Sequence, residues 1–323
     1  MKKKLIIIFV VVVNIVVPPV TAAVSGTNMD RISLREPIPL KLRYSVGETL
    51  YYRLLRHSDL FQMDGSKFGE HKAVAYYTRT RLENDSLGRV TERFTWKRFG
   101  FGQSLTPDKP AEISYLEEAK NFSLVCSVQD EDILSKFDFS GLPRTIVGMW
   151  FMIMSWDAIT FDGPVRPQKY FSFPDSAQIG TEVKSTRGAH DFEFDFSPIL
   201  TDSRYTFSGK GCSKVMGVCM VKDTPCAIIE FSDSENVILM NVDLAQVKVK
   251  SRGFEHFWGK TYLSLEDGSI LKGELLAPVA NIQDIQMPGQ EEPSHTEYFI
   301  LQRLELEMLS PEEFEREVAI EAE

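Results

Sequence analysis

Hydrophobic and polar side chains alternate along most of this chain, with turn-forming residues between the alternating segments. In residues 89–99, Val90, Phe94 and Trp96 share one face, and residues 297–309 show the same period of two. A period of two places one face of a strand in the core and the other in solvent. The pattern therefore predicts a mostly antiparallel β protein.

Three hairpins are expected where turn sequences join two alternating segments. The paired segments are residues 40–44 with 49–55, 71–82 with 89–99, and 257–265 with 270–276. In the last pair, the Asp267-Gly268 dipeptide favours a type I′ turn. In the second pair, Arg79 and Arg81 are expected to extend the solvent-exposed face, as a solvated basic patch paired with nearby carboxylates or, alternatively, as an anion site.

One segment, residues 145–161, departs from this alternation because nearly every position is apolar. Pro143 precedes it and Gly163-Pro164 follows it, as expected at the two ends of a helix. A helix with so little polar surface has to be covered on most sides. We therefore expect an incomplete barrel or strongly bent antiparallel sheet, with this one buried central helix against its concave face.

The N-terminus has the composition of a bacterial secretory signal peptide. Three lysines at positions 2–4 precede an apolar run at 5–17, and Val20 with Ala22 satisfies the small-residue rule for cleavage before Ala23. The run is shorter than the roughly 20 apolar residues that a membrane-spanning helix needs. A periplasmic or secreted protein with no stable transmembrane anchor after cleavage is expected.

The chain is expected to divide into a signal peptide (1–22), a leader (23–39), a single β-rich domain (40–309) and a short acidic C-terminal helix or tail (310–323). The last segment opens with Ser310, Pro311 and Glu313. Serine at the cap, proline at the first helical position and glutamate three residues after the serine form a capping box.

The formal net charge is -10, and loss of the three lysines of the signal peptide would change it to -13. Nucleic-acid binding depends on clustered Lys and Arg that release counterions from phosphates. An acidic body of this kind argues against a nucleic-acid partner.

The chain has four cysteines, Cys126, Cys212, Cys219 and Cys226. An even number in an exported protein favours disulfides, and the spacing of the last three differs from the C-x2-C pairs of structural zinc sites. At least one disulfide is expected, within Cys212, Cys219 and Cys226, with free buried thiols as the alternative.

The sequence lacks the motifs of common catalytic and cofactor sites. It contains no G-x-S-x-G, H-E-x-x-H, P-loop or G-x-G-x-x-G pattern, and its five histidines are scattered. No cofactor, metal site or enzymatic activity is therefore expected. A triad assembled in space from Cys, His and Asp stays as an alternative, because such residues need not be adjacent in sequence.

Two short motifs carry a resemblance to known proteins. They are Gly47-Glu-Thr-Leu-Tyr-Tyr52, at the start of a predicted strand, and Glu266-Asp-Gly-Ser-Ile-Leu-Lys-Gly-Glu274, in a late hairpin. With the central helix between the two motifs, the chain resembles secreted bacterial β-proteins that have both of them. In the overall arrangement of its strands and helix, it also resembles the half-barrel lipoprotein carriers of the LolA and LolB type. The chain lacks the lipid-attachment cysteine of the LolB type.

The central helix suggests the function. Its wall of large flexible side chains would suit a lipid or another apolar small molecule, since methionine adapts to irregular partners. The residues expected to line such a cavity are Trp150, Phe151, Met152, Met154 and Trp156. The leading expectation is a non-enzymatic exported protein that binds an apolar ligand in a concave sheet. The alternatives are that these residues are simply core, in a ligand-free structural or interaction protein of the cell envelope, and thirdly a hydrolase.

Overall fold

The computed structural model describes residues 36–127, 142, 146–165, 175–184, 192–195, 204–207, 210–244 and 247–320. Residues 35–323 belong to one compact unit. The expected signal peptide and most of the expected leader lie outside the described residues, and so do the side chains of Met152 and Trp156.

Seven long strands make up most of the described chain. They are β2 (Thr49–Gln62), β3 (Lys67–Arg81), β4 (Glu92–Ser104), β12 (Thr224–Leu244), β13 (Val247–Ser264), β14 (Ile270–Gln286) and β15 (Ser294–Leu309). The shorter strands are β1 (Ile38–Pro39), β5 (Ser114–Tyr115), β6 (Ser123–Cys126), β7 (Ser176–Ala177), β8 (Glu182–Lys184), β9 (Phe192–Asp195), β10 (Arg204–Phe207) and β11 (Cys212–Val221). The helices are α1 (Ile146–Thr160) and α2 (Pro311–Ile320), with short 3₁₀ turns η2 (Glu117–Ala119) and η3 (Gly163–Val165).

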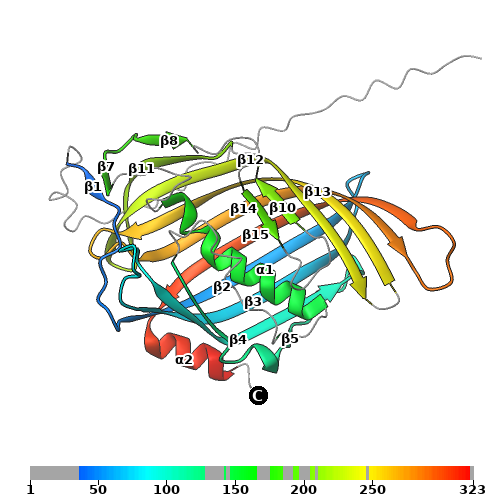
Figure 1. The fold of residues 1–323 in the computed structure, drawn as a ribbon, viewed down its shortest axis with the longest axis horizontal. Helices are drawn as coiled ribbons and strands as arrows, with labels where there is room; N and C mark the ends of the chain where they lie inside the picture. The colour runs from blue at the N-terminus through cyan, green and yellow to red at the C-terminus, as the bar shows by residue number, and fades with distance from the viewer. Residues whose placement is uncertain are drawn as a thin grey trace, which may run out of the picture. The chain divides into compact units, whose positions relative to one another are not determined.

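Thirteen strands form one antiparallel sheet, whose main path runs β5-β4-β3-β2-β15-β14-β13-β12-β10-β9 (Figure 1). Strand β6 also pairs with β4, and β11 pairs with β12 and β8. Strand β2 pairs with β15 along its length, so the first long strand lies beside the last. The prediction of a mostly β, antiparallel protein is confirmed.

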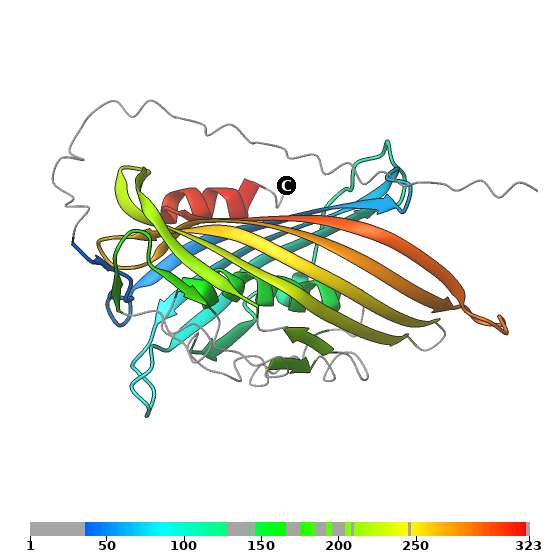
Figure 2. The same ribbon diagram turned by 90° about the horizontal axis from the view of Figure 1, so that it is seen from above.

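The two faces of the central strands have different partners. On one face, the main core packs against α1, and Leu50, Tyr52 and Leu54 of β2 belong to it. On the other face, α2 covers a smaller apolar cluster that includes Phe314, whose ring lies 5.2 Å from that of Tyr51. Figure 2 shows the two helices on opposite sides of the sheet. Even-numbered residues of β2 therefore lie on the α1 side of the sheet and odd-numbered ones on the α2 side.

Helix α1 lies within one residue, at each end, of the predicted 145–161 segment. It holds its place through aromatic contacts: the ring of Phe151 lies 5.4 Å from Trp96 of β4 and 5.3 Å from both Phe99 and Phe122. Trp96, Phe99 and Phe151 are completely buried. Edge-to-face pairs at these distances add to the energy of burial.

A buried charge network corrects the prediction for Arg79. The residue pairs in register with Phe94 and so lies on the buried face of the β3–β4 hairpin, with 1% of its surface exposed. Its guanidinium donates hydrogen bonds at 2.5 Å to Glu92 and to Asp162, which follows α1. Tyr44 donates a further hydrogen bond to Glu92. The alternation did not show this, because an arginine inside a core needs carboxylates from distant segments.

Two predicted hairpins differ in the structure. Residues 40–44 form no strand, and β2 pairs instead with β3 and β15, so the first hairpin is wrong. At the β13–β14 turn, Gly268 has a φ of 75° but Asp267 is not among the residues with positive φ. A type I′ turn needs positive φ at two successive residues. That condition is met instead between β11 and β12, by Lys222 and Asp223 at 46° and 64°.

Helix α2 begins with the predicted capping box. Glu313 donates its backbone N–H to the Ser310 hydroxyl at 3.1 Å, and Ser310 donates its own N–H to the Glu313 carboxylate at 2.9 Å. These bonds satisfy two backbone groups that the helix itself leaves open. Among the described residues, no helix combines the length and hydropathy needed to cross a bilayer.

Candidate functional site

A group of polar side chains lies on the α1 face of the sheet against Trp150. We call Arg56, Ser58, His71, Trp150 and Asp157 the Trp150 cluster. The Arg56 guanidinium carbon lies 4.9 Å from the centre of the Trp150 ring, and the His71 ring lies 5.0 Å from it at a steep angle. Arg56 Nη1 donates a hydrogen bond of 3.0 Å to Asp157 Oδ2. The cluster thus joins β2, β3 and α1.

Strand register explains why these residues meet. Ser58 of β2 pairs with His71 of β3, and Arg56 pairs with Ala73. Arg56 and Ser58 are two residues apart, so both point to the α1 face. Ala73 is small and leaves room for the arginine, and Trp150 and Asp157 lie two helical turns apart on one side of α1.

Three polar atoms of the cluster have no hydrogen-bond partner among the residues that the structure describes: Arg56 Nε, Ser58 Oγ and His71 Nε2. Each is inaccessible to solvent, and the whole of Ser58 is completely buried. Leaving a buried donor or acceptor unpaired costs about 1–3 kcal/mol. Such groups in native proteins normally meet a water molecule, an ion or a ligand, or serve catalysis. The cluster therefore offers unused donors and acceptors inside the fold.

Burial sets the ionisation of the cluster. Burial raises the pKa of Asp157 to about 6, although the charge and the hydrogen bond of Arg56 act in the opposite direction. Burial, assisted by the charge of Arg56, lowers the pKa of His71 to about 4. Near pH 7 the histidine is therefore neutral, while Arg56 and Asp157 form an ion pair. A neutral imidazole offers one donor and one acceptor.

Ser58 lies opposite His71 in register, but within the described part of the chain no hydrogen bond joins the Ser58 hydroxyl to the imidazole. A serine nucleophile is activated by a base within hydrogen-bond distance. The geometry is suited to binding, because Arg56 Nε–H, the Ser58 hydroxyl and the His71 imidazole can hydrogen-bond a small acidic or polar group.

The residues predicted to line an apolar cavity pack into the main core where they are described. Trp150 is 8% exposed, and Phe151 and Met154 are completely buried. Arg56, Ser58 and His71 were not among the residues expected to form a site. The available signal was that Arg56 and Ser58, two polar residues on one face of β2, lie between Leu54 and Leu60, and both leucines are buried.

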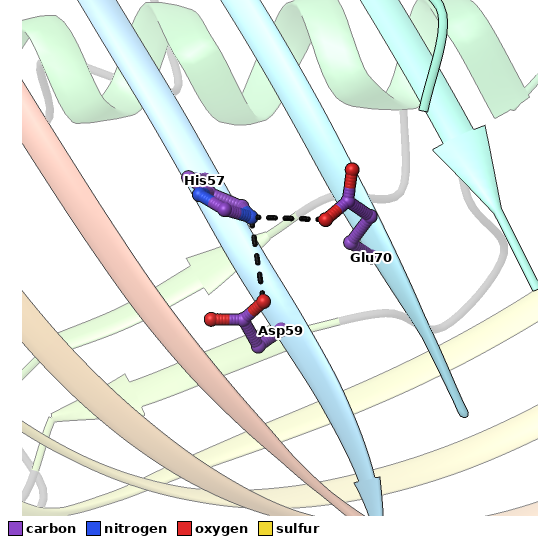
Figure 3. A group of neighbouring side chains, drawn as sticks. All are labelled: His57, Asp59 and Glu70. Atoms are coloured by element: carbon purple, nitrogen blue, oxygen red, sulfur yellow. Dashed lines mark ion pairs between the residues drawn. The ribbon is translucent and has the colours of Figure 1, made fainter. Parts of the chain in front are cut away.

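A second cluster lies on the opposite face of the same two strands. His57 and Asp59 of β2 and Glu70 of β3 point toward one another (Figure 3). His57 Nε2 is 3.4 Å from both Asp59 Oδ1 and Glu70 Oε2, and one ligand atom from each residue lies within 4.8 Å of the others. These residue types could ligate a divalent cation.

The two carboxylates of this second cluster are already bound by cations of the protein. Lys67 Nζ lies 2.7 Å from Asp59 and 3.1 Å from Glu70, and Arg303 donates to Asp59 at 2.8 Å. Hydrogen bonds from Lys72 and from a backbone N–H lower the pKa of Glu70 to about 2. A metal ion would have to displace Lys67, so the arrangement fits an ion-pair network that links β2, β3 and β15.

The four cysteines are free thiols in the structure. Cys126 and Cys226 are buried, and Cys212 and Cys219 are half-buried. Cys219 lies directly opposite Cys226 in the β11–β12 pairing. The expected disulfide is therefore not formed in the structure, although the register places two of the three candidate cysteines opposite each other.

Comparisons with known proteins identify no family. No family model matches the chain, and neither does any curated protein. Among solved structures, the chain is weakly similar to the in-vitro folded outer membrane protein OmpT of Vibrio cholerae in its trimer form, with 9% identity over 82% of this chain and 100% of that one and a TM-score of 0.12. A putative outer membrane protein of Bacteroides fragilis gives 8% identity over 80% and 96%, with a TM-score of 0.08. Scores this low carry no argument about fold or function.

Proposed function

We propose that this protein is a non-enzymatic, exported bacterial binding protein for an amphipathic ligand with an acidic head and an apolar chain. The proposed site lies between α1 and the concave face of an incompletely closed, strongly bent sheet. One observation carries the proposal: three buried polar atoms, Arg56 Nε, Ser58 Oγ and His71 Nε2, find no hydrogen-bond partner in the described ranges and belong to side chains grouped around Trp150.

The head group accounts for the polar side of the proposed site. A carboxylate or phosphate would accept hydrogen bonds from Arg56, Ser58 and His71, and charge-assisted bonds of this kind are about twice as strong as neutral ones. Arg56 already neutralises Asp157, so the bound anion would add one negative charge to the site. Entry of the ligand would be favoured when Asp157 takes up a proton.

The apolar chain accounts for the other side. Phe101 stacks on Trp150 with ring centres 4.8 Å apart, and Leu54 and Ala73 are buried on the same face of the sheet. A site with a largely apolar lining and a few convergent polar groups is typical of small-molecule binding. The resemblance to half-barrel lipoprotein carriers and the signal-peptide composition of the N-terminus are consistent with a lipid-like ligand in the cell envelope.

A fluorescent fatty-acid analogue tests the proposal. The mature protein should bind it, and Arg56→Lys, which keeps the positive charge but removes the Nε donor, should weaken binding about tenfold. Ser58→Ala should weaken it about threefold, since a neutral hydrogen bond contributes about 0.5–1.5 kcal/mol. His57→Gln is the matched control, because His57 lies between these residues but faces the other way. The corresponding fatty alcohol should bind more weakly and respond less to Arg56→Lys.

One observation favours a second candidate, a ligand-free structural or interaction protein. Phe151 and Met154 of α1 are completely buried against the sheet, as core residues are. If the analogue does not bind to folded protein, or if His57→Gln weakens binding as much as Arg56→Lys, the helix is core and this second candidate replaces the first.

A further inference from the structure

The face of β13 that points away from α1 carries a row of basic and aromatic side chains. We call this row the β13 stripe: Lys250, Arg252, Phe254, His256, Trp258 and Lys260, all of which are exposed. The alternate residues Ser251, Phe257 and Thr261 are buried on the other face. The stripe is therefore a regular feature of strand alternation on the half of the sheet that α2 does not contact.

The charges of the stripe are poorly compensated. Arg252 lies between Leu239 and Ile282 on the neighbouring strands. Asp284 lies opposite Lys250 but bonds His295 at 2.8 Å. Lys260 lies between Glu230, 3.9 Å from its ammonium group, and Glu274, which pairs with Lys272 at 2.5 Å. Among the described residues, neither Lys250 nor Arg252 forms an ion pair. In a chain of net charge -10, this is a local concentration of free positive charge.

Apolar side chains fill the centre of the same face. A single cross-strand row runs Phe61, Phe299, Ala280, Phe254 and Val237, each residue opposite the next on β2, β15, β14, β13 and β12 (Figure 1). Large side chains here are well exposed: Phe254 and Trp258 at 42%, Phe299 at 40% and Ile282 at 38%. Contiguous exposed apolar side chains on a soluble domain mark an interaction surface.

We infer that the β13 stripe docks the protein on the surface of a bilayer that contains anionic phospholipids. Lysine and arginine are attracted to the negative surface of such a membrane, and tryptophan and phenylalanine enter the interfacial region between head groups and acyl chains. Arg252 lies over the Phe254 ring at 4.8 Å, so charge and apolar surface are presented together.

A lipid surface fits this face better than a soluble polyanion. A polyanion would satisfy the cations, but it would leave the aliphatic side chains of Val237, Ile282 and Leu276 in water. An interfacial layer accepts both kinds of group. The inference goes beyond the proposed ligand site, because the stripe lies on the opposite face of the sheet and requires no bound ligand.

Co-sedimentation of the mature protein with vesicles tests the inference. Vesicles of phosphatidylcholine with one-third phosphatidylglycerol should bind the protein, and pure phosphatidylcholine should bind it much less. The double variant Lys250→Glu/Arg252→Glu should partition into the anionic vesicles at least about tenfold less, since each Lys or Arg near an anionic surface adds to the free energy of membrane binding. Phe254→Ser/Trp258→Ser should lose a similar amount without changing the lipid preference.

Lys109→Glu/Lys120→Glu is the matched control, because it changes the net charge equally at two exposed lysines far from β13 in sequence. Its partitioning into the anionic vesicles should fall by less than about threefold. All four substituted stripe positions are exposed, so the variants should melt like the parent protein. The inference is overturned if both charge variants lose binding equally, if the lipid composition has no effect, or if the stripe binds heparin but not vesicles. Fatty-acid binding is measured separately, so failure here leaves the proposed ligand site standing.

Discussion

Removing the positive charge of the buried Arg79 network should destabilise the protein strongly. Arg79 is 1% exposed, and Glu92 and Asp162 are completely buried. In the variant Arg79→Met both carboxylates would lose the charge-assisted hydrogen bonds that Arg79 donates to them. Breaking a buried ion pair by removing one partner typically costs about 3–5 kcal/mol. Two carboxylates depend on this guanidinium, so we expect the upper end of that range.

Urea unfolding at pH 7.5, followed by tryptophan fluorescence, measures this loss. With a urea m-value of about 3 kcal/mol/M for a chain of this size, the midpoint should fall by about 1.5 M. The matched control is Arg93→Met, on β4 beside Glu92 but exposed, and it should change stability by less than about 0.5 kcal/mol. The slope should stay unchanged in both variants.

A compensated variant separates lost charge pairing from lost packing. Arg79→Met/Glu92→Met/Asp162→Leu replaces the network by apolar side chains, which in other buried ion pairs is neutral or stabilising. It should recover most of the stability lost in the single variant. The guanidinium does not stabilise the fold in this way if Arg79→Met costs no more than Arg93→Met, or if the triple variant is less stable than Arg79→Met alone.

Four further predictions follow from particular residues. Because the pKa of Asp157 is raised from 3.8 to about 6, the folded state holds an extra proton between these values, so its stability falls as pH rises through this window. The stability of the parent protein relative to Asp157→Asn should fall by up to about 3 kcal/mol from pH 4 to pH 7, and a flat difference in urea titrations would contradict this. Oxidised protein should contain a Cys219–Cys226 disulfide, seen by peptide mapping without reductant; four free thiols in exported material would remove this claim. Ser310→Ala should lower stability by about 1 kcal/mol through loss of the α2 cap, and no change in melting temperature would mean that the helix end frays without effect. Exported protein should begin at Ala23, and N-terminal sequencing that finds Met1 would contradict cleavage.

Local pattern was enough to predict the class of fold and several of its elements. Alternation with a period of two predicts strands that are half-buried, and this held for most of β4 and for the middle of β15. It did not hold for β3, because residues 73–79 are buried on both faces, one against the main core and the other against the cluster that α2 covers. A run that is apolar on every side has to be covered, and most side chains of α1 (Ile146–Thr160) that the structure describes are buried. The Ser310–Glu313 capping box depends on residues three apart, so the sequence alone determines it.

Contacts between distant segments were decided by the tertiary structure. The sequence predicts that β2 is a strand, but it does not predict which strands lie beside it. The β2–β15 pairing joins residues more than 200 positions apart, and no local signal specifies it. Arg79 was assigned to the surface because a buried arginine is recognisable only once Glu92 and Asp162 are brought beside it. The Trp150 cluster was missed for the same reason.

The two faces of β2 show which features the sequence determines and which depend on the tertiary structure. From residue 56 to residue 59 the sequence is Arg-His-Ser-Asp, which by itself is a short polar interruption in an apolar strand. Alternation determines that Arg56 and Ser58 share one face and that His57 and Asp59 share the other. Which face meets α1 and which meets Lys67 and Arg303 depends on the packing of the whole sheet, because burial and charge pairing arise only between segments that folding has brought together.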